Sequence, residues 1–169
     1  HGTRFHFCRV PQARFLFDAA AALAEGATPN IVFVVEPHED NVFDQQLLAN
    51  ALQLAGAKVQ RLTLDQLQQL VTDNPAGQHS LYDAQQQPVH LLYFRTGYNM
   101  ADYPSPSLLT LRLQLEPFDL LLCPTLSQQL VGSKWLQLKL SQYLQQPTRH
   151  AEFAAQFGFS LAETRQLAA

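Results

Sequence analysis

Apolar residues gather in short, nearly continuous runs separated by longer amphipathic stretches. Residues 31–35 and 89–94 are rich in β-branched and aromatic side chains, and residues 119–123 form a shorter apolar run. Runs of this length and composition predict strands buried on both faces of a sheet. Residues 58–62 predict a further strand. A polar stretch over residues 72–87 contains Asn74-Pro75 and Gly77 and predicts a loop with a short hairpin.

Helix signals fill most of the remaining chain. The Ala-rich segment 11–25 has high helix propensity, and Gly26 follows it as a left-handed cap. Asn41 is placed to cap a second helix that runs past Leu54 to Gly56, and Thr63 to cap a short helix over residues 64–71. Further helices are predicted from Ser105-Pro106 to residue 116, over residues 126–144 with a break at Gly132, and over residues 152–159.

The helices and strands alternate along the chain. This order predicts a three-layer α/β/α domain with a largely parallel sheet, and 169 residues suit a single domain. In such folds the ligand crevice lies beyond the carboxyl ends of the strands. We therefore look for functional residues in the loops that follow the strands.

Composition excludes several classes of protein. The chain is 47% hydrophobic and 15% charged, which argues against disorder, and its net charge of -3 with scattered basic residues argues against nucleic acid as a partner. No apolar run reaches the roughly 20 residues of a membrane span. Cys8 and Cys123 lack paired spacing, so we expect a reducing compartment, a soluble cytoplasmic protein and a buried, inert Cys123. The histidines show no metal-ligand spacing, and we expect no metal or cofactor in this chain.

Polar side chains crowd the loop and helix start after the first strand. Asn41 and Gln45 are four residues apart, so a helix beginning at Asn41 brings their amides together where free N–H groups favour an anion such as a carboxylate. In the alternative interpretation Asn41 is only a helix cap, Asp44 interacts favourably with the helix dipole from the first turn, and Gln45 is a solvated side chain. The residues alone leave both interpretations open.

The strand over residues 89–94 leads into Arg95-Thr96-Gly97-Tyr98. Arginine can bind a carboxylate through two parallel hydrogen bonds, and Gly97 allows the backbone to approach a ligand closely. The alternative is a structural turn in which Arg95 pairs with a nearby acid and Tyr98 lies on the core. Lys134 follows Gly132-Ser133 but lacks the spacing of a phosphate-binding P-loop.

Four segments in order resemble a known family: Asn41-Val-Phe-Asp-Gln-Gln46, Leu92-Tyr-Phe-Arg-Thr-Gly-Tyr98, Cys123-Pro124 and Gln129-Leu-Val-Gly-Ser-Lys134. They are similar, at closely similar spacing, to the substrate-binding domain of eukaryotic-type glutathione synthetase. The similarity is clear over residues 31–144. The residue between Arg95 and Gly97 varies in the family, the helix after Ser105 is one residue longer than usual, and Trp135 replaces a common second lysine.

The resemblance implies a Rossmann-like domain of an ATP-grasp ligase that joins glycine to γ-glutamylcysteine, using ATP and magnesium through an acyl-phosphate. It assigns Asn41, Gln45, Arg95, Thr96, Gly97 and Tyr98 to binding of γ-glutamylcysteine or glutathione. It gives Asp44 a supporting role and Lys134 a contact with ATP, and it makes none of these residues catalytic. The family's enzymes are usually dimers, so a homodimeric parent is implied.

The chain lacks a glycine-rich ATP loop and a carboxylate cluster for magnesium, both of which acyl-phosphate chemistry needs. We therefore expect it to be inactive alone and to work with an ATP-grasp domain of the same parent protein. It begins His1-Gly2-Thr3-Arg4 without an initiating Met, which favours a part of a larger ligase. The alternatives are a stand-alone, non-catalytic binding or interaction module that retains the fold, and a domain from a relative that ligates another amine.

Overall fold

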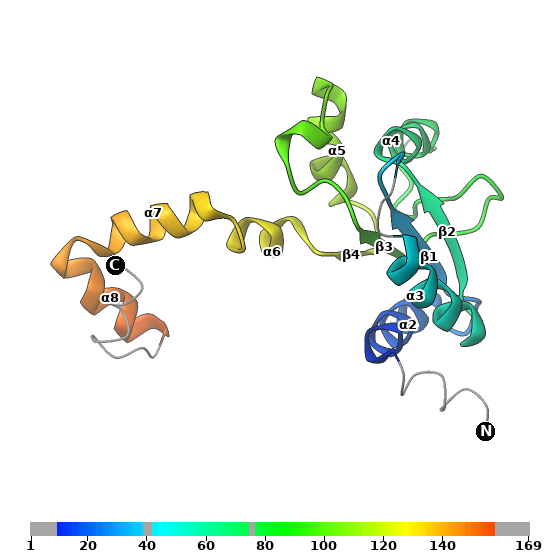
Figure 1. The fold of residues 1–169 in the computed structure, drawn as a ribbon, viewed down its shortest axis with the longest axis horizontal. Helices are drawn as coiled ribbons and strands as arrows, with labels where there is room; N and C mark the ends of the chain where they lie inside the picture. Colours follow the sequence, from blue (N-terminus) through cyan, green and yellow to red (C-terminus); the bar gives the residue numbers. More distant parts are fainter. Residues whose placement is uncertain (1–9, 39–41, 75–76, 158–169) are drawn as a thin grey trace. The chain divides into compact units, whose positions relative to one another are not determined.

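The computed structural model describes residues 10–38, 42–74 and 77–157. The chain divides into two compact units, His1–Thr125 and Leu126–Ala169, and each is described by itself. The first unit carries the sheet, and the described part of the second is helical (Figure 1). The expectation of a single domain stays a prediction.

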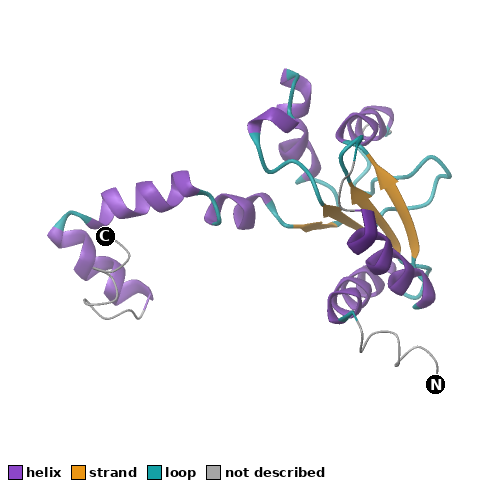
Figure 2. Ribbon diagram, in the orientation of Figure 1, coloured by secondary structure: helices purple, strands orange, loops and turns teal. Residues whose placement is uncertain are grey.

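Four parallel strands form the sheet in the order β2 (Lys58–Leu62), β1 (Asn30–Val34), β3 (Leu91–Phe94) and β4 (Leu121–Cys123) (Figure 2). Every residue of β1 is buried, as its continuous apolar run predicts. β3 and β4 are each two residues shorter at their amino ends than predicted. The backbone N–H groups of Val89 and Asp119 donate to Leu81 and His79, both in the loop that precedes β3, rather than to a neighbouring strand.

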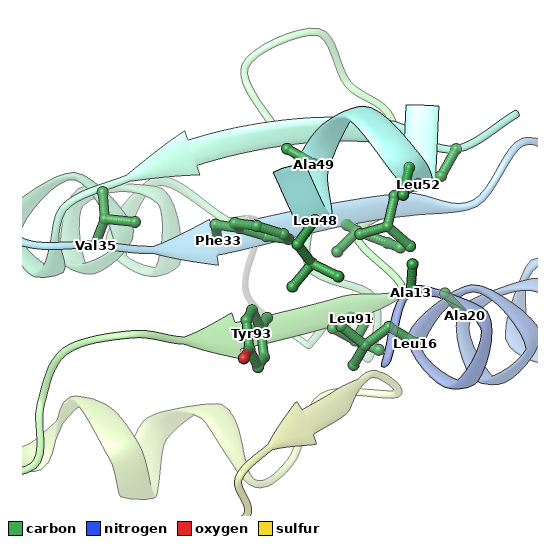
Figure 3. Packing of buried hydrophobic residues seen from close by; sticks show 13 residues of the cluster. Ala13, Leu16, Ala20, Phe33, Val35, Leu48, Ala49, Leu52, Leu91 and Tyr93 are labelled. Carbon is green, nitrogen blue, oxygen red and sulfur yellow. The ribbon is translucent and has the colours of Figure 1, made fainter. Parts of the chain in front are cut away.

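Helices α2 (Pro11–Ala24) and α3 (Val42–Leu54) cover one face of the sheet. Figure 3 shows apolar side chains of both helices gathered over alternate residues of β1 and β3, including Phe33 and Tyr93. The rings of Phe33 and Tyr93 meet edge to face with centroids 5.2 Å apart. This core fixes α2 and α3 against the strands that lead to the predicted ligand loops.

The opposite face is covered by α4 (Leu64–Asp73) and α5 (Pro106–Leu115), which pack over Val32, Val34, Leu92 and Phe94. Side chains alternate between the two faces along each strand, so neighbouring residues enter different cores. The predicted three-layer α/β/α architecture with a parallel sheet is confirmed.

The predicted helix boundaries follow from capping. Thr63 and Gln66 form a reciprocal capping box at the start of α4, and Ser105 accepts from the N–H of Leu108 at the start of α5. At the end of α2, both Glu25 (φ 47°) and the predicted Gly26 (φ 94°) are left-handed, so the helix stops one residue early. The short 3-10 helix η1 (Met100–Asp102) was not predicted. The predicted hairpin is reduced to one antiparallel bridge between Tyr82 and Pro88.

The second unit contains α6 (Leu126–Val131), α7 (Lys134–Leu144) and α8 (Pro147–Phe157). The predicted break at Gly132 is present, and Ser133 caps α7 by accepting from the N–H of Leu136. α8 begins five residues earlier than predicted, with Pro147 at its first position. Within the described ranges, no helix has the length and apolar character needed to cross a membrane.

A buried carboxylate joins the amino ends of β1 and β2 to the loop before β3. Asp83 is 2% exposed, and its Oδ2 accepts from Lys58 Nζ at 2.6 Å. The same oxygen accepts from Gln60 and Asn30, and Oδ1 accepts from the backbone N–H groups of Gln85 and Gln87. Burial alone raises the pKa of Asp83, but these hydrogen bonds, that of Lys58 foremost, outweigh it and lower the pKa to about 2.

The lowered pKa of Asp83 predicts how the stability of the folded chain changes at acid pH. Its folded pKa lies below the ordinary value of 3.8, so its stabilisation is present above pH 4 and is lost as the pH falls from about 4 towards 2. We expect Asp83→Asn to lower the free energy of unfolding by about 2 kcal/mol at pH 7, with a smaller deficit near pH 2.5. Urea unfolding at several pH values measures this. Asp18→Asn, at an exposed carboxylate paired with Arg14, is the control; an equal, pH-independent loss in both variants contradicts the assignment.

Candidate functional site

The carboxyl edge of the sheet has a topological switch point between β1 and β3. From β1 the chain continues into α3 on one face, whereas from β3 it continues into α5 on the other. The two connections diverge and leave a crevice where open α/β sheets bind ligands. The loops at this point begin at Val35 and Arg95, whose N–H groups still bond to the neighbouring strands.

A cavity of about 240 Å³ lies on the α2 and α3 side of this edge, and we call it the Arg95 pocket. It brings together three of the predicted residues, Asp44, Gln45 and Arg95. Its remaining lining residues are Val10, Gln12, Leu47, Leu48 and Tyr93. One exposed acid, one arginine and several amide or phenol groups therefore face a partly apolar hollow.

Gln45 carries the clearest indication of a ligand. Its side chain is 2% exposed, yet neither its Oε1 nor its Nε2 has a hydrogen-bond partner among the described residues. Arg95 Nε, also buried, has none there either. A buried polar atom left unpaired costs about 1 to 3 kcal/mol, so these groups favour a polar ligand. The interpretation of Gln45 as a solvated side chain is wrong.

Tyr93 and Gln12 belong to the same wall and were missed by the sequence analysis. Gln12 Nε2 donates to the Tyr93 hydroxyl at 2.8 Å, and Arg95 Nη1 donates to the same oxygen at 3.4 Å. No acid among the described residues forms an ion pair with Arg95. Because side chains alternate along a strand, Tyr93 faces the same side as Arg95, and that spacing could have identified it.

The same alternation separates Thr96 from Arg95. Thr96 is 2% exposed and lines a second cavity of about 260 Å³ on the α4 and α5 side, together with Glu36, Asp65 and Asp102. The sequence prediction placed both residues on one ligand. The structure brings Gln45 and Arg95 together and turns Thr96 towards the opposite face of the sheet.

A network of hydrogen bonds closes the loop after β3. Asp102 Oδ2 accepts from the backbone N–H groups of Gly97, Tyr98 and Asn99 at 2.9 to 3.2 Å. The Tyr103 hydroxyl donates to Gly97 O at 2.8 Å. Gly97 has φ 83°, and a Cβ there would lie 2.5 Å from that hydroxyl. Asp102 is a structural residue of the loop that the sequence analysis did not single out.

Tyr98 is 53% exposed, so the interpretation that it lies on the core is wrong. Its hydroxyl donates to Phe94 O at 2.6 Å, which folds the side chain back along β3. Burial of the phenol raises the pKa of Tyr98, and the neighbouring Tyr93 raises it further. The phenol therefore stays protonated at neutral pH.

Three predicted residues, Asn41, Lys134 and Asp44, have roles that the structure does not test. Asn41 falls outside the described residues. Lys134 is the exposed first residue of α7 in the second unit. Asp44 is exposed in the first turn of α3. The roles assigned to these three residues stay predictions.

Two further residues, Cys123 of β4 and Arg112 of α5, lie at the β4 end of the sheet. Cys123 is only partly exposed but is not fully buried as predicted, and its partial burial raises the pKa of the thiol, which disfavours the reactive thiolate. Arg112 of α5 is 4% exposed, lies 3.8 Å above the Phe94 ring and donates from Nη2 to Pro124 O at 2.8 Å. In the described ranges, no group of three or more His, Cys, Asp or Glu residues is arranged to hold a metal ion.

Comparison with known proteins identifies the family to which the chain is similar. The profile of the family described as eukaryotic glutathione synthase matches residues 29–131, which include β1, β3, α5 and the Arg95 loop. Chloroplastic glutathione synthetases of Arabidopsis thaliana and Solanum lycopersicum are 31% and 33% identical over 141 and 144 residues. Glutathione synthetase of Xenopus laevis is 32% identical over 124 residues.

These matches cover 79%, 79% and 73% of this chain but only 26%, 25% and 25% of the relatives. The chain thus spans about a quarter of the length of the curated relatives it matches. The family profile covers more than half of the chain, including both strands at the switch point. The chain belongs to the eukaryotic glutathione synthase family.

Proposed function

We propose that this chain is the substrate-binding domain of a glutathione synthetase and that the Arg95 pocket binds γ-glutamylcysteine or glutathione. The observation that carries the proposal is the buried, unpaired Gln45 amide beside the unpaired Nε of Arg95, in a cavity at the switch point. Family membership supports the choice of ligand.

The chemistry of the pocket suits such a peptide. Both peptides carry carboxylates, which a guanidinium binds through charge-assisted hydrogen bonds. The Gln45 amide offers one donor nitrogen and one acceptor oxygen, so it can pair with a carboxylate and with an ammonium or amide N–H. Asp44, at the exposed rim, supplies a negative charge for an ammonium group.

The loop after β3 supports the same proposal because it is held before any ligand arrives. Asp102 and Tyr103 fix the backbone of Gly97, and Tyr98 is tied back to Phe94. A loop ordered in advance loses little conformational freedom on binding. Thr96, Gly97 and Tyr98 then contribute through the geometry of the loop beside Arg95.

Ligation itself belongs, in this proposal, to the whole enzyme. ATP would supply the phosphoryl group of the acyl-phosphate that precedes attack by glycine and leave as ADP, magnesium would neutralise charge on the transferred phosphate, and an ATP-grasp domain of the same parent protein would hold both. Lys134 contacts ATP there, and this chain alone is inactive. The parent is a homodimer. Two relatives carry the word chloroplastic in their names; for this chain we propose the cytoplasm.

The proposal predicts direct binding. Titration of the ¹⁵N-labelled chain with γ-glutamylcysteine, and separately with glutathione, is expected to give saturable amide shifts at Gln45 and Arg95. ATP in a third titration is expected to leave both residues unshifted. A folded sample with no shifts up to several millimolar peptide contradicts the proposal and favours a stand-alone module that keeps the fold for another purpose.

Arg95→Ala separates ligand binding from stability. We expect it to weaken binding of either peptide by about 1.5 to 3 kcal/mol, because a charge-assisted contact is lost, while the unfolding midpoint changes little. Arg61→Ala is the matched control, since Arg61 is exposed on the edge strand β2. Unchanged affinity together with loss of folding would instead assign Arg95 to the scaffold.

Gly97→Ala tests the ordered loop. The left-handed backbone and the approach to the Tyr103 hydroxyl together predict a loss of about 1 to 3 kcal/mol in unfolding free energy. Gly56→Ala is the control, because Gly56 also has positive φ (102°) but nothing within 4 Å of the added Cβ. We expect thermal unfolding to show a larger loss at Gly97 than at Gly56; equal losses show that Tyr103 does not restrict the loop.

A further inference from the structure

The Tyr93 hydroxyl is an oxygen that receives hydrogen bonds from two sides. Gln12 Nε2 reaches it from α2 at 2.8 Å, and Arg95 Nη1 reaches it from the end of β3 at 3.4 Å. The residue is 6% exposed and lines the Arg95 pocket. Figure 3 shows its ring on β3 close to Phe33 and Leu48, with the hydroxyl oxygen at the far end of the ring.

The single proton of the Tyr93 hydroxyl decides which of its neighbours can be a donor and which an acceptor. A phenol has one proton to donate and lone pairs that accept. Gln12 and Arg95 both present N–H groups, so the Tyr93 proton points to neither of them. No described residue accepts it. The phenolic O–H is therefore an unused donor in the wall of a cavity that already contains unpaired donors on Gln45 and Arg95.

We propose that Tyr93 is a further ligand-binding residue, whose hydroxyl donates a hydrogen bond to a carboxylate oxygen of the bound peptide. Gln12 is its positioning residue, because the donated N–H keeps the phenolic proton turned towards the ligand. The inference rests on the proposed function for the class of ligand. It adds a neutral donor beside the Arg95 guanidinium and makes α2 part of the binding site.

A carboxylate fits these donors better than a neutral group does. It accepts from several donors at once, and its charge strengthens each hydrogen bond. Tyr93 O–H and the Arg95 guanidinium lie on one wall, so two oxygens of one carboxylate can pair with both. A carboxamide at the same place has a single acceptor oxygen and no charge.

The first test uses the full 169-residue chain and three ligands: γ-glutamylcysteine and its two analogues in which one carboxyl group or the other is a carboxamide. We expect Tyr93→Phe to raise the Kd for γ-glutamylcysteine about tenfold. For the analogue that keeps the carboxylate facing Tyr93, the variant should still raise the Kd about tenfold. For the analogue in which that carboxylate is a carboxamide, the increase should fall to about threefold, since a neutral acceptor forms a weaker hydrogen bond. Tyr82→Phe, outside the Arg95 pocket, is the control and should bind like the wild type.

The second test reverses the direction of the hydrogen bond. Gln12→Glu replaces the donor by an acceptor of the same shape, which draws the Tyr93 proton to itself and also adds a negative charge. In the Tyr93→Phe background only the charge acts. We therefore expect Gln12→Glu to raise Kd about tenfold more when Tyr93 is present than when it is Phe. Gln12 is exposed, so this variant is expected to fold even if Tyr93→Phe does not.

The outcomes separate the two proposals. A wild-type chain that binds none of the three ligands overturns the proposed function and this inference with it. Wild-type binding with an unchanged Kd in Tyr93→Phe overturns only the role of Tyr93. An equal loss for all three ligands shows that Tyr93 acts through packing and also overturns it. Additive effects of Gln12→Glu and Tyr93→Phe overturn the positioning role of Gln12.

Discussion

The parallel pairing of β1 with β3 is the constraint on which the candidate site depends. It places the loops that follow these two strands side by side, although about 60 residues separate them in sequence. Both strands are buried on both faces, so their register is fixed by two cores at once. The position of Arg95 relative to α3 therefore follows from the packing of Phe33 and Tyr93 in the core.

Two polar side chains at this edge are buried at some cost to the fold. Gln45 and Arg95 bury polar atoms that the described residues leave unpaired, and the surrounding apolar core offsets that penalty. The carboxylate at the amino ends of the strands contrasts with these two residues. Asp83 is equally buried, but donors on two strands and its own loop satisfy both of its oxygens. The buried carboxylate at one edge of the sheet is thus satisfied internally, whereas at the other edge the buried atoms of Gln45 and Arg95 have no partner among the described residues.

Much of this arrangement could be predicted from the sequence, because its information is local. The apolar runs of β1 and β2, the Thr63 and Ser105 caps and the break at Gly132 each depend on neighbouring residues. Gln45 and Arg95 were predicted as ligand-binding residues because strand ends and helix starts are recognisable; the structure places both in one cavity, and the ligand stays a prediction. Gln12 and Tyr93 were missed because a hydrogen bond between residues 81 positions apart leaves no local pattern. Thr96 was assigned to the ligand of Arg95 because the strand alternation was not continued into the loop.

Arg112 gives the end of the sheet an unusual dependence on temperature. Its guanidinium lies between the Phe94 ring and the carbonyl of Pro124, so one buried cation connects the last residue of β3 with the segment after β4. Hydration of a charged group becomes less favourable as water warms, whereas hydrophobic stabilisation per unit area reaches a plateau. The penalty for keeping Arg112 dry therefore shrinks on heating. On heating, the contribution of the Arg112 contacts between β3 and the segment after β4 therefore grows relative to the hydrophobic stabilisation of the two cores, which no longer increases.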